Sequence, residues 1–74
     1  ELTKNEFKIM ELLMKRKGRV VPREDFIQAL WDTEDFIDDN TLTVNVARLR
    51  QRLKSMGVEE LISTKKGLGY LIEE

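Results

Sequence analysis

Seventy-four residues suffice for one domain, and a chain of this size buries only roughly 60% of its unfolded surface. Of its residues 41% are hydrophobic and 36% are charged, and 14 acidic residues against 13 basic ones give a net charge of −1. Neither cysteine nor histidine is present, which excludes disulfides, thiolate metal sites and the commonest general base. Without a secretion signal or an apolar run of membrane length, we expect a cytoplasmic protein with no membrane partner.

The first predicted element is a helix over residues 4–17. Thr3 and Glu6 have the spacing of a capping box, in which each side chain satisfies the other residue's backbone N–H. Gly18 is a suitable residue for the reversal after the helix. The hydrophobic residues cover an arc of about 220°, taking 100° per residue. Because this arc is wider than one packing face needs, we expect part of it to be covered by a segment outside this sequence.

Residues 19–21 are predicted to be extended, because Pro22 disfavours helical backbone at the residue before it. Pro22 can also begin a second helix, whose hydrophobic side ends at Trp31. A loop with five acidic residues between Asp32 and Asp39 follows. The loop leads into a third helix over residues 40–56.

Asp39 or Asn40 is expected to cap the third helix, and Gly57 to end it. Residues 61–65 and 70–73 are strand-like, with Gly67 and Gly69 in the turn between them. The sequence thus predicts three helices followed by a β-hairpin.

The third predicted helix separates hydrophobic from basic residues. Residues 40–58 contain four basic residues and no acidic one, and residues 40–70 carry a net charge of +4 while residues 1–39 carry −3. An inward stripe with the spacing i, i+4, i+7 and i+11 is formed by Leu42, Val46, Leu49 and Leu53. The outward face then carries Thr43, Val44, Ala47, Arg48 and Gln51.

This outward face suits a helix that lies in the major groove of DNA. Small side chains let the backbone approach the bases, Arg48 can reach guanine, Gln51 can reach adenine, and Val44 can contact a thymine methyl group. The alternative is a solvated basic face. Two helices followed by a hairpin with Lys65, Lys66 and Gly67 at its tip favour DNA, although an ordinary polar turn is the alternative for the two lysines.

Three motifs, in this order, resemble the winged-helix effector domain of OmpR/PhoB-type response regulators. They are LT-x-x-E-F at residues 2–7, V-x-V-x-R-L-R-x-(+)-L at 44–53, and I-x-T-x-(+)-G-x-G-Y at 62–70. The resemblance covers nearly the whole chain. It implies a mainly α winged helix-turn-helix domain over residues 1–74, with a C-terminal hairpin as the wing. The sheet that precedes the LT motif in the family is absent here, so we expect a fragment of a longer two-domain regulator.

The resemblance also implies a function, namely sequence-specific DNA binding that regulates transcription as the output of a two-component system. The helix at 40–56 is expected in the major groove, and the hairpin at 61–73 as the wing. The implied partners are double-stranded DNA with repeated half-sites, RNA polymerase, a receiver domain in the full-length chain and, indirectly, a sensor kinase. No cofactor or metal is implied.

Individual positions match family residues that contact DNA or the polymerase. We expect base contacts from Arg48, Val44, Thr43, Ala47 and Gln51, and phosphate contacts from Arg50, Arg52, Asn45, Asn40, Trp31, Tyr70 and Thr64. For Trp31, a role in the core is the alternative. The loop expected to face RNA polymerase contains Asp32, Glu34, Asp35, Phe36, Asp38 and Asp39. Asn40, Thr43, Asn45 and Ala47 depart from the residues frequent in the family, which leaves the target sequence and the number of phosphate contacts open.

Two other functions compete with DNA binding. Without histidine and cysteine, an enzyme would have to use the acidic cluster, which lacks the glycine and the final glutamate of an EF-hand calcium loop. We therefore expect no enzymatic activity. The stronger alternative is a winged-helix protein–protein interaction module that uses the acidic loop. A steep fall of DNA affinity with salt would separate DNA binding from this alternative.

Overall fold

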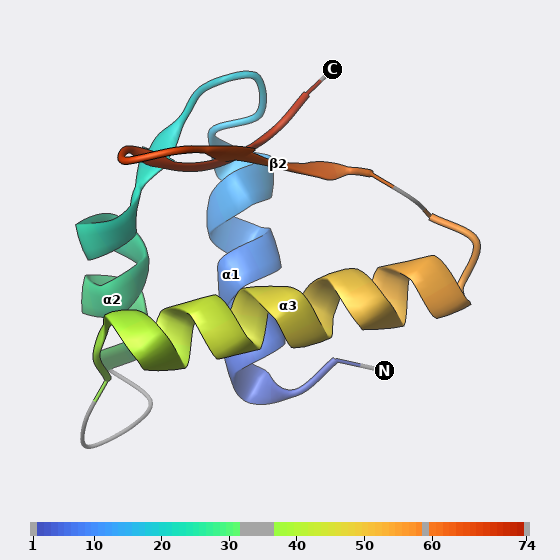
Figure 1. The fold of residues 1–74 in the computed structure, drawn as a ribbon, viewed down its shortest axis with the longest axis horizontal. Helices are drawn as coiled ribbons and strands as arrows, with labels where there is room; N and C mark the ends of the chain where they lie inside the picture. Colours follow the sequence, from blue (N-terminus) through green and yellow to red (C-terminus); the bar gives the residue numbers. More distant parts are fainter. Residues whose placement is uncertain (1, 32–36, 59, 74) are drawn as a thin grey trace.

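Three helices and three short strands make up the computed structural model, which describes residues 2–31, 37–58 and 60–73. In chain order they are α1 (Lys4–Lys15), β1 (Val21–Pro22), α2 (Arg23–Trp31), α3 (Asp39–Ser55), β2 (Ile62–Lys65) and β3 (Gly69–Ile72). Figure 1 shows α3 crossing α1, with α2 beside the start of α3 and the sheet along the opposite side of the molecule. This arrangement confirms the predicted three helices with a C-terminal wing.

Helix α1 begins with the predicted capping box. The backbone N–H of Glu6 donates to Thr3 Oγ1 at 3.2 Å, and the N–H of Thr3 donates to Glu6 Oε1 at 3.1 Å. The helix ends at Lys15, two residues before the predicted end, and the backbone of Arg16 already leaves the helical conformation, with a φ of −116°. Phe7 and Met14 are exposed on α1, so the described residues leave part of its hydrophobic arc uncovered, as the width of that arc predicted.

The sheet is antiparallel with the strand order β1-β3-β2. The prediction of an isolated extended segment and a two-stranded hairpin was therefore incomplete, since β1 adds to the edge of the hairpin. Val21 pairs with Tyr70, and Pro22 pairs with Gly69. An edge strand tolerates proline because one side of it needs no ladder hydrogen bond.

Gly69 lies in β3 rather than in the turn where we expected it. A Cβ atom at this position would stand 1.9 Å from the carbonyl oxygen of Val21. The close approach of β1 to β3 therefore requires glycine here. Gly67 is in the turn, with a φ of 78°, which is the left-handed region that glycine enters at least cost.

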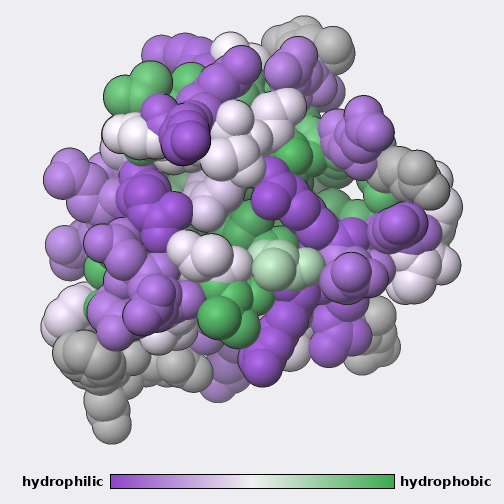
Figure 2. All heavy atoms as spheres, in the orientation of Figure 1, coloured by the Kyte–Doolittle hydropathy of each residue, from purple (hydrophilic) through white to green (hydrophobic). Residues whose placement is uncertain are grey.

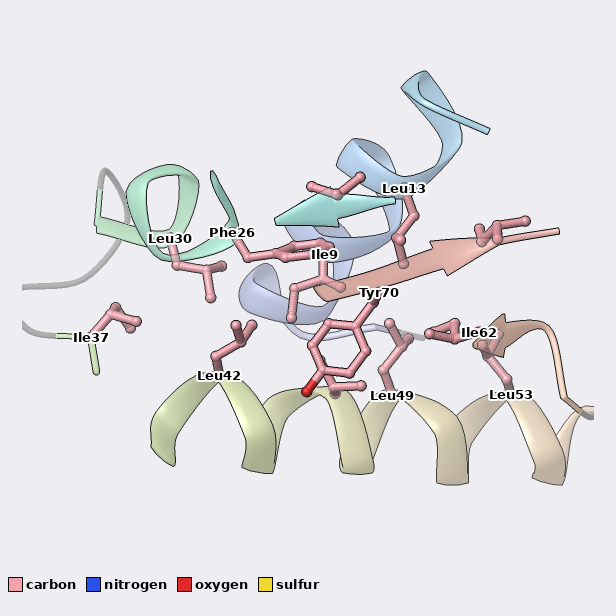
Figure 3. Packing of buried hydrophobic residues seen from close by; sticks show 13 residues of the cluster. Ile9, Leu13, Phe26, Leu30, Ile37, Leu42, Leu49, Leu53, Ile62 and Tyr70 are labelled. Atoms are coloured by element: carbon pink, nitrogen blue, oxygen red, sulfur yellow. The ribbon is translucent and has the colours of Figure 1, made fainter. Parts of the chain in front are cut away.

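The buried hydrophobic residues that the structure describes form a core that joins the helices to the sheet (Figure 3). All four residues of the predicted inward stripe of α3 are buried in it. The rings of Phe26 and Tyr70 meet edge to face, with centroids 5.8 Å apart, an arrangement that aromatic pairs prefer. None of the described helices has the length and apolarity needed to cross a membrane.

Helix α3 is capped by Asp38, not by Asp39 or Asn40 as predicted. The Asp38 carboxylate accepts hydrogen bonds from the backbone N–H of Thr41 at 2.8 Å and from its hydroxyl at 2.9 Å. These bonds stabilise the charged carboxylate and lower the pKa of Asp38. The cap thus satisfies one of the first backbone N–H groups of α3, which have no partner within the helix.

Candidate nucleic-acid interface

The burial of the inward stripe turns the opposite side of α3 to solvent. Thr43, Val44, Ala47, Arg48 and Gln51 are all exposed. Figure 2 shows a small hydrophobic area on the face that α3 crosses, bordered by hydrophilic side chains. Short side chains with one long basic residue among them can let a helix backbone come close to base edges.

The Arg48 side chain forms no hydrogen bond and no ion pair with any residue that the structure describes. It lines a shallow hollow between α3 and the start of α1, together with Asn5, Asn40 and Val44. Its guanidinium, which can donate five hydrogen bonds, therefore remains available to an external acceptor.

Arg50 is also exposed, but its side chain is held in place. Nη2 donates to Thr64 Oγ1 at 2.5 Å and to the Ile62 carbonyl at 3.1 Å. The guanidinium carbon stands 5.8 Å from the centre of the Tyr70 ring. These contacts tie α3 to β2 without a carboxylate, so the positive charge of Arg50 stays uncompensated within the described chain.

Arg52 differs from Arg48 and Arg50 because an acid neutralises it. Its Nε lies 2.6 Å from Glu6 Oε1, and the Glu6 side chain is only 1% exposed whereas that of Arg52 is 47% exposed. A buried carboxylate needs a compensating charge or hydrogen bonds. This pairing gives Arg52 a structural partner and weakens the case for its predicted phosphate contact.

Two other residues predicted to meet phosphates are buried. Asn45 is 8% exposed, and its side-chain amide donates to the Thr41 carbonyl at 2.8 Å. Tyr70 is 4% exposed, and its hydroxyl accepts a hydrogen bond from Arg23 Nη1 at 2.8 Å. Figure 3 shows the Tyr70 side chain between β3 and α3. Both side chains support the fold, whereas Asn40, Thr64 and Trp31 lie at the surface.

The wing turn, residues 65–68, is closed by a hydrogen bond from the Leu68 N–H to the Lys65 carbonyl at 2.8 Å. Lys65, Lys66 and Gly67 are exposed. Gly67 borders open space, since a Cβ atom added at this position would meet no heavy atom within 4 Å. The turn therefore presents two ammonium groups on a compact loop.

Sequence reasoning missed Arg23, which stands at the first position of α2. A positive charge there opposes the helix dipole, and this mismatch was the available signal that Arg23 needs partners. Its guanidinium bonds to Asp39, Thr43 and Tyr70. Its backbone N–H donates to the Leu68 carbonyl of the wing turn at 3.3 Å. Arg23 thus contacts both the wing turn and the first turns of α3.

The predicted polymerase-facing loop is only partly described. Asp32, Glu34, Asp35 and Phe36 lie outside the described residues. Asp38 caps α3, and Asp39 Oδ1 lies 2.9 Å from Arg23 Nε. Among the described residues, no group of three or more acidic, histidine or cysteine side chains is arranged to hold a metal ion.

Comparison with known proteins places this geometry in a family. A sequence model of the family described as "Transcriptional regulatory protein, C terminal" matches residues 1–72. The chain is 54% identical over 74 residues to the sensory transduction protein BceR of Halalkalibacterium halodurans and 49% identical over 73 residues to the response regulator protein GraR of Staphylococcus aureus. These matches cover 100% and 99% of this chain but only 32% and 33% of the relatives, so the chain spans about a third of their length.

Two solved structures share the fold. The C-terminal domain of the nisin resistance regulator NsrR, a lantibiotic response regulator, is 38% identical, with a TM-score of 0.83 over 99% of this chain and 74% of that one. The DNA-binding domain of the response regulator AdeR, solved in complex with an intercistronic region, gives a TM-score of 0.85 over 100% of this chain and 75% of that one, at 23% identity. The chain belongs to the family of C-terminal domains of transcriptional regulatory proteins, in its OmpR/PhoB response-regulator branch.

Proposed function

We propose that this chain binds double-stranded DNA in a sequence-specific way and thereby regulates transcription. The observation that carries the proposal is the exposed, acid-free outer face of α3, where Arg48 has no partner among the described residues. Arginine bonds guanine O6 and N7 with two parallel hydrogen bonds in the major groove. The family to which the chain belongs supports the same role.

The contacts follow from the exposure of each side chain. Arg48 is assigned to a base, with Thr43, Val44, Ala47 and Gln51 around it on α3. Arg50, held by Thr64, is assigned to a phosphate, together with Asn40 and Trp31. The wing lysines, Lys65 and Lys66, are assigned to the neighbouring minor groove or its phosphates. Phosphate contacts fix the register of the helix, and base contacts select the sequence.

The first test is fluorescence anisotropy with labelled duplexes. A duplex is first enriched from a random pool by the wild-type chain, and its affinity is then measured over a salt series. We expect the affinity to fall steeply with salt. The logarithm of the binding constant should fall linearly with the logarithm of the salt concentration, with a slope of about −0.9 for each phosphate that the protein neutralises. A flat salt dependence, or no binding at low salt, would refute DNA binding and favour the protein–protein interaction module.

The second test distinguishes a base contact by Arg48 from a non-specific attraction between its charge and DNA. Arg48→Ala should reduce discrimination between the enriched duplex and single-base variants at one position by about 1–3 kcal/mol. Arg19→Ala is the matched control, because it removes one exposed arginine from the connection between α1 and β1, on the far side of the sheet from α3 (Figure 1). Unchanged discrimination in Arg48→Ala would overturn the assignment of this residue.

We further infer that the domain is the output part of a longer two-domain response regulator. The named relatives are about three times as long as this chain, and the exposed Phe7 and Met14 on α1 offer a surface for an additional segment. The implied partners are a receiver domain in the same chain, a sensor kinase that acts through it, repeated DNA half-sites and RNA polymerase. The proposed role is one of binding rather than catalysis, and it requires a cytoplasmic location, where bacterial DNA is transcribed.

A further inference from the structure

Arg23 occupies the junction between the two elements assigned to DNA. It is the first residue of α2 and directly follows β1. Its backbone is tied to the wing turn through the hydrogen bond to the Leu68 carbonyl. Its side chain contacts the first two turns of α3 through Asp39 and Thr43. One residue therefore touches both the wing and the helix proposed for the major groove.

The guanidinium uses its donors on three different partners. Nε donates to Asp39 Oδ1 at 2.9 Å, and Nη2 donates to the Asp39 carbonyl and to Thr43 Oγ1, each at 2.8 Å. Nη1 donates to the Tyr70 hydroxyl at 2.8 Å, and the guanidinium carbon stands 5.6 Å from the centre of the same ring. Such a planar fork fixes direction as well as distance, which a lysine ammonium on a flexible stem does not.

These partners belong to the parts of the domain whose relative position matters for DNA. Asp39 and Thr43 lie in the first two turns of α3, and Thr43 is on its outer face. Tyr70 is in β3, directly opposite Thr64 of β2, and Thr64 orients Arg50. A shift of the Arg23 guanidinium would therefore move the start of α3 relative to the hairpin.

We propose that Arg23 is a positioning residue that sets the spacing between the recognition helix and the wing, and thereby the sequence preference of the domain. The inference rests on the proposed function. It assigns no direct DNA contact to Arg23, because each guanidinium nitrogen already donates to a partner within the domain. Non-specific binding, which depends mainly on phosphate charge, should be nearly independent of this residue.

The test compares Arg23→Lys and Arg23→Gln with wild type on two probes, the enriched duplex and a shuffled duplex of the same composition. Both variants should bind the enriched duplex about tenfold more weakly, the factor expected when one good base contact is lost. Binding of Arg23→Lys to the shuffled duplex should change less than about twofold, because the charge is kept. Arg19→Gln is the matched control, and should leave the ratio between the two probes unchanged.

A further variant keeps the test decisive if both Arg23 substitutions unfold the chain, which circular dichroism would show. Tyr70→Phe removes only the hydroxyl that accepts from Arg23, and leaves the buried ring in place. We expect Tyr70→Phe to lower the ratio between the affinity for the enriched duplex and the affinity for the shuffled duplex by about threefold. This is smaller than the loss of about tenfold expected when a whole base contact is lost. An equal loss on both probes would instead indicate a phosphate contact by Tyr70, and would overturn the inference.

The possible failures are distinct. If the wild-type chain enriches no duplex, the proposed function fails and the role of Arg23 fails with it. If wild type discriminates and Arg23→Lys discriminates equally well, only the inference about Arg23 is overturned. If Arg23→Gln loses discrimination between the two duplexes and Arg23→Lys keeps it in full, Arg23 contributes charge and not geometry. This result would also overturn the inference about Arg23.

Discussion

Breaking the ion pair between Glu6 and Arg52 should destabilise the domain in a way that depends on which partner is removed. Glu6 stands in the first turn of α1 and Arg52 near the end of α3, so the pair joins two elements far apart in the sequence. Glu6 is almost fully buried, whereas Arg52 is half exposed. Arg52→Gln therefore leaves a carboxylate inside the protein with the Thr3 N–H as its remaining described donor. Glu6→Gln instead leaves an arginine that can turn into water.

The magnitude follows from this burial. Removing one partner of a fully buried ion pair costs about 3–5 kcal/mol of the free energy of unfolding. Because half of the Arg52 side chain is in contact with water, solvent screens the pair, and we expect about 1–2 kcal/mol for Arg52→Gln. In a domain of this size that loss lowers the unfolding midpoint by roughly 5–15 °C. Glu6→Gln should cost less, since its amide oxygen can still accept from Thr3.

Urea unfolding followed by circular dichroism measures these changes for wild type, both single variants and the double variant. We expect the double variant to be closer in stability to Glu6→Gln than to the sum of the two losses, with a coupling of about 1 kcal/mol. Lys54→Gln is the matched control, because it removes an exposed positive charge from the same helix, and should change stability by less than about 0.5 kcal/mol. Additive losses, or an Arg52→Gln variant as stable as the control, would refute the reasoning.

Three further outcomes test other parts of the structure. Asp38→Ala should lower the unfolding midpoint at neutral pH, while Asp38→Ser should keep most of the cap. Because the hydrogen bonds from Thr41 lower the pKa of Asp38 in the folded state, the stability that the carboxylate contributes is present above its unfolded pKa and is lost as the pH falls through its folded pKa. The curves of stability against pH for wild type and Asp38→Ala should therefore converge in acid. Gly69→Ala should cost about 2–4 kcal/mol because its Cβ would overlap the Val21 carbonyl, whereas Gly67→Ala, in open space but at positive φ, should cost about 1 kcal/mol; equal losses in urea unfolding would contradict this. Asp35→Lys should reduce transcription activation in a reporter assay and leave DNA affinity unchanged, and a loss of DNA binding would count against a polymerase-facing loop.

Features set by neighbouring residues could be predicted from the sequence. The capping box of α1 needs only Thr3 and Glu6, and the inward stripe of α3 needs only the helical period. Both were confirmed. The cap of α3 was missed by one residue because Asp38, Asp39 and Asn40 are all good capping types. The structure selects Asp38, whose carboxylate accepts from the backbone N–H and the hydroxyl of Thr41.

Features that join distant segments could not be predicted in the same way. Nothing near Val21 and Pro22 indicates that they pair with Tyr70 and Gly69, since strand pairing depends on how the helices bring the chain back. The partners of Arg23 and Arg52 are likewise set by packing. An arginine on a basic helix looks the same in the sequence whether it meets an acid of its own domain or remains free. The sequence therefore could not show that Arg52 pairs with Glu6, and its contact with a phosphate stays a prediction.

The pairings show how a chain with a net charge of −1 can carry a locally positive surface. Glu6 pairs with Arg52, and Asp39 pairs with Arg23, and each of these pairs connects α3 to another helix. Arg50 is oriented by a hydroxyl and a carbonyl rather than by a carboxylate, and Arg48 has no partner within the described chain. Two of the acids thus pair with arginines that serve packing, and residues 40–55 of α3 contain no acid. A phosphate that approaches this face responds to that local charge rather than to the sum over the chain.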